Sequence, residues 1–409
     1  MNNDYIVLRE LGKKYIEIAS SDRNYDNIVQ HRKVNDLQTK SPIILVDEIP
    51  WGEMNIDGEL TLHCIDPEFR AMEEHLRKSI YKWEHMSTHM VLPPYLSVRK
   101  VVNSTGIGMD TMYEDESEYS KVSTHHFVDQ LQTEEDLEKL KLEKITYDEE
   151  STKKKFDVMA DIFSDIVPVR ISGIPTGYNL GCKNWDDIVF FRGLDTLLFD
   201  LIERPEFMHK IVKKLTDIFV DKVKQYEELG IFDTDMYSLH CASALNNTLK
   251  PDKEKPKAKD MWGRGLAQIF STVSPEMHDE FDIQYMVKAM EMFGMVYYGC
   301  CEPLDKKIHI LEQIKNLRKI SITPWADISV AAEAIGEKYV VSVKPNPASL
   351  STSSLDEYAV KKELSTLISS CVKNGCSFEL VLKDITTVGG NVENLFKWTN
   401  IAMDMVNSI

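Results

Sequence analysis

Long apolar runs are missing from this sequence, and none approaches the roughly 20 residues of a membrane-spanning helix, so we expect no membrane partner. Positive charge is also scarce, because 48 lysine and arginine residues stand against 66 aspartates and glutamates, a formal net charge of −18. Such an acidic chain does not attract nucleic acid by bulk electrostatics, and we expect no nucleic-acid partner. The first residues lack the basic region and apolar core of a secretory signal, which favours a cytoplasmic location.

Cysteine is sparse as well. The seven cysteines are odd in number and scattered over 409 residues, unlike the disulfide framework of a small secreted protein, and they fit a reducing compartment. Residues 103–108 contain two glycines but lack the spacing and the Gly-Lys-Ser/Thr ending of a phosphate loop. They predict a turn rather than a nucleotide site.

What the sequence does contain is an alternation of short apolar runs with helical patterns. The runs lie at 42–46, 95–102, 167–172, 236–240, 295–299, 319–323, 339–343 and 378–382. Strands that alternate with helices predict parallel pairing through right-handed crossovers. Eight such units favour a closed (β/α)8 barrel of the TIM type over an open sheet, within the α/β class.

Two segments stand outside this alternation. Residues 1–40 are polar and charged, and they predict an N-terminal helical arm ahead of a single barrel domain at 41–409. Residues around 110–160 are rich in Asp, Glu, Lys and Ser, which predicts a solvated excursion inserted into the barrel.

The stretch at 295–304 is the strongest candidate for the centre of a site. A short apolar and aromatic run ends at Gly299 and is followed at once by Cys300, Cys301 and Glu302. In a parallel barrel, the residues just after each strand form the working face. We therefore expect these three residues to act in catalysis. The alternative is that the cysteines pack as small apolar side chains.

The same rule brings other strand ends to this face. His240 and Cys241 end or follow the run at 236–240, and with Cys300 and Cys301 they can converge on one ion. Thiolate and imidazole donors in a tetrahedral site favour Zn²⁺, so we expect Cys241, Cys300 and Cys301 as metal ligands and His240 as a catalytic partner. Two alternatives stay open: the cysteines face the barrel wall and bind no metal, or a cysteine is a nucleophile with His240 as its base.

A substrate pocket is expected beside these residues. Tyr298, Trp325, Lys344 and Asn346 lie in or just after predicted strands, and we expect them to line the pocket. Trp325 and Lys344 suit an aromatic or anionic substrate.

The order of these features resembles the uroporphyrinogen decarboxylase superfamily, which includes the methylcobamide:coenzyme M methyltransferases. The resemblance covers roughly 160–409 and rests on 193–206, 273–281, the strand that enters Cys300, and 326–347. It implies a (β/α)8 barrel with a central cleft. For the methyltransferase branch it also implies bound zinc and a corrinoid supplied by a partner protein.

Departures from the family motifs bear on which activity to expect. The decarboxylases carry an Arg-Gln-Ala-Gly-Arg segment that grips substrate carboxylates, whereas this chain has Asp-Glu-Ile-Pro at 47–50. The zinc methyltransferases carry His-x-Cys where this chain reads Tyr298-Gly-Cys300, so the cysteine matches and the histidine does not. Their later cysteine has no counterpart near Lys383. Cys241, Cys301 and Glu302 are the residues placed to supply the missing ligands.

The leading hypothesis is a methyltransferase of the corrinoid-dependent type. It moves a methyl group between a small methylated compound or thiol and a corrinoid-binding protein, with zinc activating the heteroatom. A second hypothesis is a lyase that acts on a tetrapyrrole or other polycarboxylate without a cofactor. A third is a barrel that binds a ligand without catalysis. The oligomeric state stays open, with a homodimer as one option.

Overall fold

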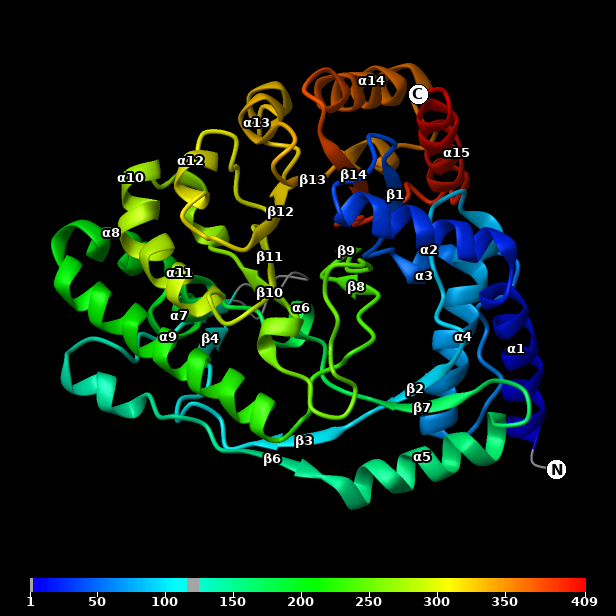
Figure 1. The fold of residues 1–409 in the computed structure, drawn as a ribbon, viewed down its shortest axis with the longest axis horizontal. Coiled ribbons are helices and arrows are strands. Elements are labelled where there is room, and N and C mark those ends of the chain that lie inside the picture. The colour runs from blue at the N-terminus through cyan, green and yellow to red at the C-terminus, as the bar shows by residue number, and fades with distance from the viewer. Residues whose placement is uncertain (1–2, 116–124) are drawn as a thin grey trace.

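The computed structural model describes residues 3–115 and 125–409 (Figure 1). Its main sheet has six parallel strands, in the order β1 (Ile43–Val46), β14 (Ser377–Leu382), β13 (Val340–Val343), β12 (Leu317–Ile322), β11 (Met295–Tyr298) and β10 (Trp262–Gly265). A separate parallel pair joins β2 (Leu96–Arg99) to β7 (Val169–Ser172). The predicted α/β class with parallel strands is confirmed. The parallel ladders among the described residues form this sheet and this pair, and they do not show the predicted closed ring of eight.

Alternation along the strands gives the sheet two faces of different chemistry. On β14, Phe378 and Leu380 pack with the helices in the largest apolar cluster, whereas Glu379 between them points to the opposite face. The helices that contribute most to this cluster are α9 (Pro205–Glu228), α11 (Gln284–Met290), α12 (Ile308–Leu311), α13 (Ile328–Ile335), α14 (Glu357–Lys373) and α15 (Glu393–Asn407). We call this opposite face, which carries Glu379 and its ion-pair partner Lys319, the inner face of the sheet.

A short hairpin lies against that inner face. Its strands are β8 (Ser238–Leu239) and β9 (Ala242–Ser243), and Figure 1 shows them between the six-stranded sheet and the β2–β7 pair. The Ser243 backbone N–H donates to Glu379 at 3.3 Å, and Lys319 donates to the Ser243 carbonyl at 2.7 Å. The prediction that 236–240 is a strand of the main sheet is therefore wrong. The chain reverses at His240 and Cys241 instead of continuing along the sheet.

The strand that joins the main sheet here is β10, which has no counterpart among the predicted strands. Its sequence, Trp-Gly-Arg-Gly, contains neither an apolar run nor β-branched residues, so it carries no strand signal. Close packing explains the glycines. A Cβ at Gly263 would lie 2.5 Å from the Phe293 ring, and a Cβ at Gly265 would lie 2.4 Å from the Met286 sulfur. The strand needs glycine so that α11 and the segment after it can approach.

Replacing Gly263 with alanine tests this explanation of β10. The added methyl group has to displace the buried Phe293 ring, and we expect the free energy of unfolding to fall by about 1–3 kcal/mol, the usual cost of overpacking. Urea denaturation measures the change. Gly52→Ala is the matched control, because a Cβ there meets no atom within 4 Å. Equal effects of the two substitutions would contradict the explanation.

The N-terminal part packs onto the rest of the chain rather than projecting from it. Helices α1 (Asn3–Ala19) and α2 (Asp22–Asn35) occupy the predicted arm. Helix α1 contacts α4 (Pro67–His85) and α5 (Glu149–Phe163), and it buries Leu8, Leu11 and Tyr15 against them. Figure 1 places α1 and α4 along one side of the β2–β7 pair.

The predicted polar excursion contributes strands to two antiparallel pairs. The expected strand at 95–102 is divided at Lys100 into β2 and β3 (Val101–Ser104), and β3 pairs with β6 (Ile145–Asp148). Further out, β4 (Tyr113–Asp115) pairs with β5 (His125–Phe127), while 116–124 lie outside the described residues.

The other helices are α3 (Trp51–Met54), α6 (Thr176–Asn179), α7 (Asn184–Arg192), α8 (Leu194–Glu203) and α10 (Pro275–His278). None of the described helices combines the length and apolar character that crossing a membrane requires.

Candidate functional site

Four chain segments meet beyond the carboxyl ends of the parallel strands. Glu48 follows β1, Cys300 and Cys301 follow β11, and Lys383 follows β14. The fourth segment is the tip of the β8–β9 hairpin, which carries His240 and Cys241. Parallel α/β sheets place their ligands at this edge, because the side chains after neighbouring strands converge there.

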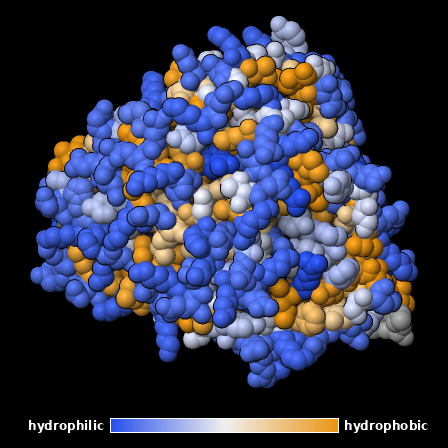
Figure 2. Space-filling model, viewed as in Figure 1, coloured by the Kyte–Doolittle hydropathy of each residue, from blue (hydrophilic) through white to orange (hydrophobic). Residues whose placement is uncertain are grey.

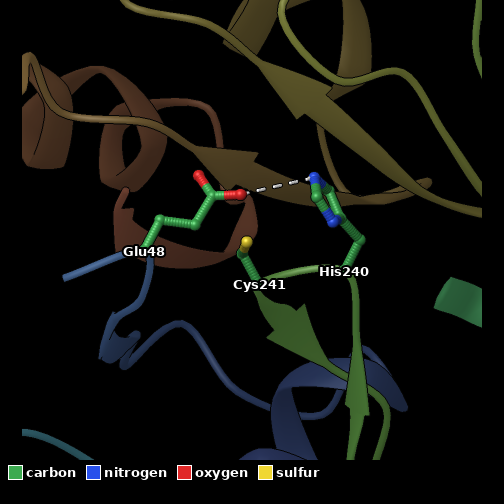
Figure 3. A group of neighbouring side chains, drawn as sticks. All are labelled: Glu48, His240 and Cys241. Carbon is green, nitrogen blue, oxygen red and sulfur yellow. Dashed lines mark ion pairs between the residues drawn. The ribbon is translucent and has the colours of Figure 1, made fainter. Parts of the chain in front are cut away.

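The tightest group in this region is Glu48, His240 and Cys241. One donor atom from each residue lies within 4.8 Å of the donors of the other two. Figure 3 shows the Glu48 carboxylate and the His240 ring directed toward each other, with the Cys241 sulfur near both. The Glu48 Oε1 and His240 Nε2 atoms are 4.0 Å apart. We call this group the donor trio.

The backbone around the trio is held in an unusual conformation. Among the described residues, four non-glycine positions have a positive φ, and three of them are Glu48 at 49°, Cys241 at 59° and Asp384 at 56°. A left-handed conformation of a non-glycine residue typically costs about 1–3 kcal/mol, so surrounding contacts must hold it. Here the Asp384 N–H donates to Glu48 Oε2 at 3.1 Å. The concentration of such residues at one place points to a functional site.

Two adjacent thiols lie beside the trio. The sulfurs of Cys300 and Cys301 are 3.7 Å apart, Cys301 is 4.0 Å from an Asp384 oxygen, and Cys300 is hydrogen-bonded with the His240 ring. The hydrogen bond between the two thiols and burial raise the pKa of Cys300, and the same hydrogen bond together with nearby Lys383 lowers the pKa of Cys301. Cys301 is therefore the thiol of this pair that more readily becomes a thiolate.

Two lysines give the site its positive charge. Burial lowers the pKa of Lys344 to about 8, and its ammonium donates to Ser342 on the inner face of β13. Lys383 lies 3.3 Å from Glu48 Oε2 and also pairs with Asp384. Burial opposes the charged form of Lys383, but Asp384, the two thiols and Glu48 together raise its pKa. The site thus contains a permanent cation next to two carboxylates.

Burial raises the pKa of two trio members. For Cys241, burial acts together with the charges of Asp47 and Glu48. For Glu48, burial acts together with a hydrogen bond to the Asp384 carboxyl, and Lys383 opposes both. Both groups therefore hold a proton more strongly than they would in water, and a bound cation would oppose this effect.

Glu302 lies close in sequence but is not directed into the site. Its side chain is fully buried and accepts the backbone N–H groups of Cys300 at 2.9 Å and of Ala267 at 3.1 Å. These hydrogen bonds fix the course of the loop that carries the thiols. The structure therefore gives Glu302 the geometry of a residue that positions Cys300.

The structure does not bring Tyr298 to the site. It packs in the apolar cluster formed with the helices, and its hydroxyl donates to Asp282 at 2.6 Å and lies 2.7 Å from His278 Nε2. The neighbouring Tyr297 points to the opposite face and packs in the cluster that contains the hairpin. Because strand residues alternate between faces, the tyrosine on the hairpin side of β11 is Tyr297.

Two of the remaining predicted pocket residues, Trp325 and Asn346, have surroundings of their own. The side chain of Trp325 is 74% exposed, in the loop after β12. Asn346 caps the 3₁₀ helix Pro347–Ser351, where its side-chain oxygen accepts the Ala348 N–H at 3.0 Å. Of the four predicted pocket residues, Lys344 is the one whose charge acts on the thiols.

Glu48 is the functional candidate that the sequence reasoning missed. Asp47 and Glu48 directly follow the first predicted strand, so the strand-end rule that selected Cys300 also applies to them. The positive φ of Glu48 turns its carboxylate toward the hairpin tip, and no sequence pattern predicts that turn.

Comparison with known proteins gives limited information. No family model matches the chain, and no curated protein matches it either. Among solved structures, the fold is similar to that of a methyltransferase from Methanosarcina mazei, with 10% sequence identity and a TM-score of 0.49, over 93% of this chain and 98% of that one. A likeness at this level carries no argument about activity, so the function is inferred from the side chains.

Proposed function

We propose that this chain is a zinc-assisted methyltransferase of the corrinoid-dependent type, belonging to the uroporphyrinogen decarboxylase superfamily. It transfers a methyl group between a small methylated compound or thiol and a corrinoid held by a partner protein. The observation that carries the proposal is the donor trio of Glu48, His240 and Cys241 at the carboxyl edge of the parallel strands. The family motifs around Cys300 support the choice of reaction.

The trio fits zinc by its chemistry and by its number of donors. Carboxylate oxygen, imidazole nitrogen and thiolate sulfur are the ligands that zinc takes in proteins, at about 2.0–2.3 Å. Donors within 4.8 Å of one another need to move only slightly to reach one ion. Three protein ligands with a fourth position open to substrate is the arrangement of catalytic rather than structural zinc sites.

Zinc held there would supply Lewis acidity that favours the deprotonated form of a thiol substrate at neutral pH. Side chains of this chain position the ligands and supply positive charge. Lys383 pairs with Glu48 and Asp384 and fixes the carboxylate that faces His240. Lys344 adds positive charge beside Cys241 and Cys300, which favours an anionic sulfur nearby. The thiols of Cys300 and Cys301 lie beside the trio, where they would adjoin a substrate bound there.

The barrel expected from the sequence is part of the proposal. Two isolated parallel bridges, Ile174 to Phe232 and Cys182 to Gly265, extend the pairing from the β7 side toward β10. They support a (β/α)8-type arrangement in which the β8–β9 hairpin occupies the interior and carries two zinc ligands to the working face.

Metal content of variants tests the metal part of the proposal. Protein purified without chelator should contain about one zinc per chain. His240→Ala and Cys241→Ser should each lower the zinc affinity by about 100-fold or more, since removing a ligand costs at least as much as removing its supporting residue. Cys371→Ser is the matched control, because this buried cysteine lies on α14 away from the trio. Zinc content equal to wild type in both trio variants would contradict the site.

The reaction class needs a separate measurement. Zinc-loaded protein mixed with methylcob(III)alamin and a small thiol should convert the absorption spectrum to that of the demethylated corrinoid, and the His240→Ala variant should lose this conversion. Titration with uroporphyrin should leave the Soret band unshifted. A Soret shift together with an unchanged corrinoid spectrum would favour the lyase and overturn the methyltransferase.

A further inference from the structure

A large cavity lies on the other side of the hairpin from the six-stranded sheet. It has a volume of about 730 Å³ and is bounded by α4, α5, β2 and the segment 233–238, with Tyr15 of α1 at its inner end. Figure 2 shows a hollow over β2 and β7 in which pale and orange side chains surround a small, strongly hydrophilic patch. None of the trio residues lines this cavity. It is therefore a second place in the molecule where a ligand fits.

The hydrophilic part of the wall carries a guanidinium without an ion-pair partner. Arg99 ends β2 and lines the cavity with an exposed side chain, and within the described part of the chain this side chain makes no hydrogen bond or ion pair. The other β-strand arginine of this pair, Arg170, is engaged: it stacks on the Tyr95 ring at 4.4 Å and lies 3.5 Å from Asp235. The planar fork of Arg99 is suited to a carboxylate.

The carboxylates around the cavity leave Arg99 available. Asp235 is within 3.5 Å of Arg170 and 4.0 Å of Lys253, so its charge is balanced. Asp233 accepts the Asp235 N–H, and burial raises the pKa of Asp233; the nearby charge of Arg99 opposes this rise, but the two groups do not form an ion pair. Glu68 is exposed, where water screens it, and Lys155 adds a second cation to the wall.

Most of the rest of the wall is apolar and aromatic, and it also includes His75 and three serines, Ser97, Ser172 and Ser238. Tyr95 and Tyr237 meet edge to face with ring centroids 6.3 Å apart, and buried Leu76, Phe163 and Tyr15 form the inner end. A pocket of this size, mostly apolar with a few fixed polar groups, is the usual form of a small-molecule site. We propose that the cavity binds a small organic acid, with Arg99 holding the carboxylate and the tyrosine and aliphatic walls covering the apolar body.

This inference goes beyond the proposed methyl transfer and does not depend on it. The two sites are connected through the chain, because segment 233–238 forms one wall of the cavity and leads directly into the hairpin tip with His240 and Cys241. A binding experiment without metal therefore tests the cavity alone.

Calorimetric titration of the purified full chain in the presence of a chelator is the test. The probes are octanoate and 4-phenylbutyrate, each compared with its neutral amide, octanamide and 4-phenylbutanamide. At least one acid should bind about tenfold more tightly than its amide. Arg99→Gln should remove that difference by weakening the acid about tenfold while leaving the amide unchanged. Arg204→Gln makes the same change in charge outside the cavity and should have no effect.

Two further variants keep the result interpretable. Ala71→Trp places a large side chain into the cavity from α4 and should weaken both acid and amide, with Arg99 intact. His240→Ala should leave acid binding unchanged, which separates the cavity from the donor trio. The proposal is overturned if no acid binds more tightly than its amide, if Arg204→Gln weakens the acid as much as Arg99→Gln, or if His240→Ala abolishes acid binding.

Discussion

Replacing Lys319 with methionine should lower the free energy of unfolding by about 3–5 kcal/mol, because it leaves a buried carboxylate without its partner. The Lys319 ammonium and the Glu379 carboxylate are 2.9 Å apart, and both side chains are fully buried. The pair lies between the inner face of the sheet and the hairpin, where Lys319 also donates to the Ser243 carbonyl. Urea denaturation of wild type and variant measures the difference.

Two comparisons show whether the buried pair is responsible. In the double variant Lys319→Met/Glu379→Leu no unpaired charge is left, so much of the lost stability should return. Lys338→Met breaks the pair with Glu312, whose side chains are 61% and 40% exposed, and it should change the stability by less than about 1 kcal/mol. A loss below about 1 kcal/mol in Lys319→Met itself would show that the buried ion pair does not hold the hairpin in place.

The buried pair also explains how the donor trio is positioned. The Glu379 carboxylate accepts the Ser243 N–H and the Ser342 hydroxyl, so β9 is fixed to β13 and β14 through one side chain. From α2, Asn35 donates to the Ser243 hydroxyl and the Leu245 carbonyl. The hairpin is thus held at its base by polar contacts. Its tip, with His240 and Cys241, can adopt the strained turn that the site requires.

The strands that could be predicted are those whose own side chains carry the signal. The runs at 42–46, 295–299 and 339–343 are apolar on both faces, and each is a strand of the sheet. By contrast, β10 is buried on both faces with glycines that only its neighbours require, and 236–240 has a strand pattern but forms a hairpin. Pairing partners depend on contacts far apart in sequence, which a local pattern does not contain.

The residues of the candidate site also fall into those that the sequence predicts and those that it does not. Strand-end placement selected His240, Cys241, Cys300 and Cys301, and the structure brings all four into one region. It leaves Tyr298 on the helix side of β11, because alternation along the strand assigns the inner face to Tyr297. Glu48 and Asp384 belong to the site because left-handed backbone turns at these residues bring their side chains there. Such turns are favoured by glycine, so a glutamate and an aspartate give no sign of them in the sequence.

Acidification should destabilise the protein between about pH 6.5 and pH 4, through the buried His31 and the partly buried His89. Burial lowers the pKa of His31 and of His89 from 6.5 to about 4. His89 Nδ1 accepts the Ile44 N–H of β1 at 3.0 Å, so it cannot take a proton without losing that hydrogen bond. His31 lies between the Ser243 hydroxyl, at 2.8 Å, and the His89 carbonyl, at 2.6 Å.

The direction of this effect follows from proton binding. Below pH 6.5 the unfolded chain binds protons at both histidines while the folded chain does not, so stability is present above that pH and is lost as the pH falls toward 4. Each histidine accounts for roughly 3 kcal/mol at 1.36 kcal/mol per pKa unit. Urea midpoints measured across this range report the loss.

Substitution of one histidine separates this cause from general acid denaturation. In His89→Asn the amide oxygen takes the place of Nδ1 as acceptor for the Ile44 N–H, so the fold is retained and one titrating group is removed. The fall in stability between pH 6.5 and 4 should then shrink by about half of the histidine contribution, whereas His309→Asn, at an exposed position, should leave it unchanged. An unaltered pH dependence in His89→Asn would mean that this histidine is protonated in the folded chain. The hydrogen bond from β1 that fixes its neutral form would then not persist in solution.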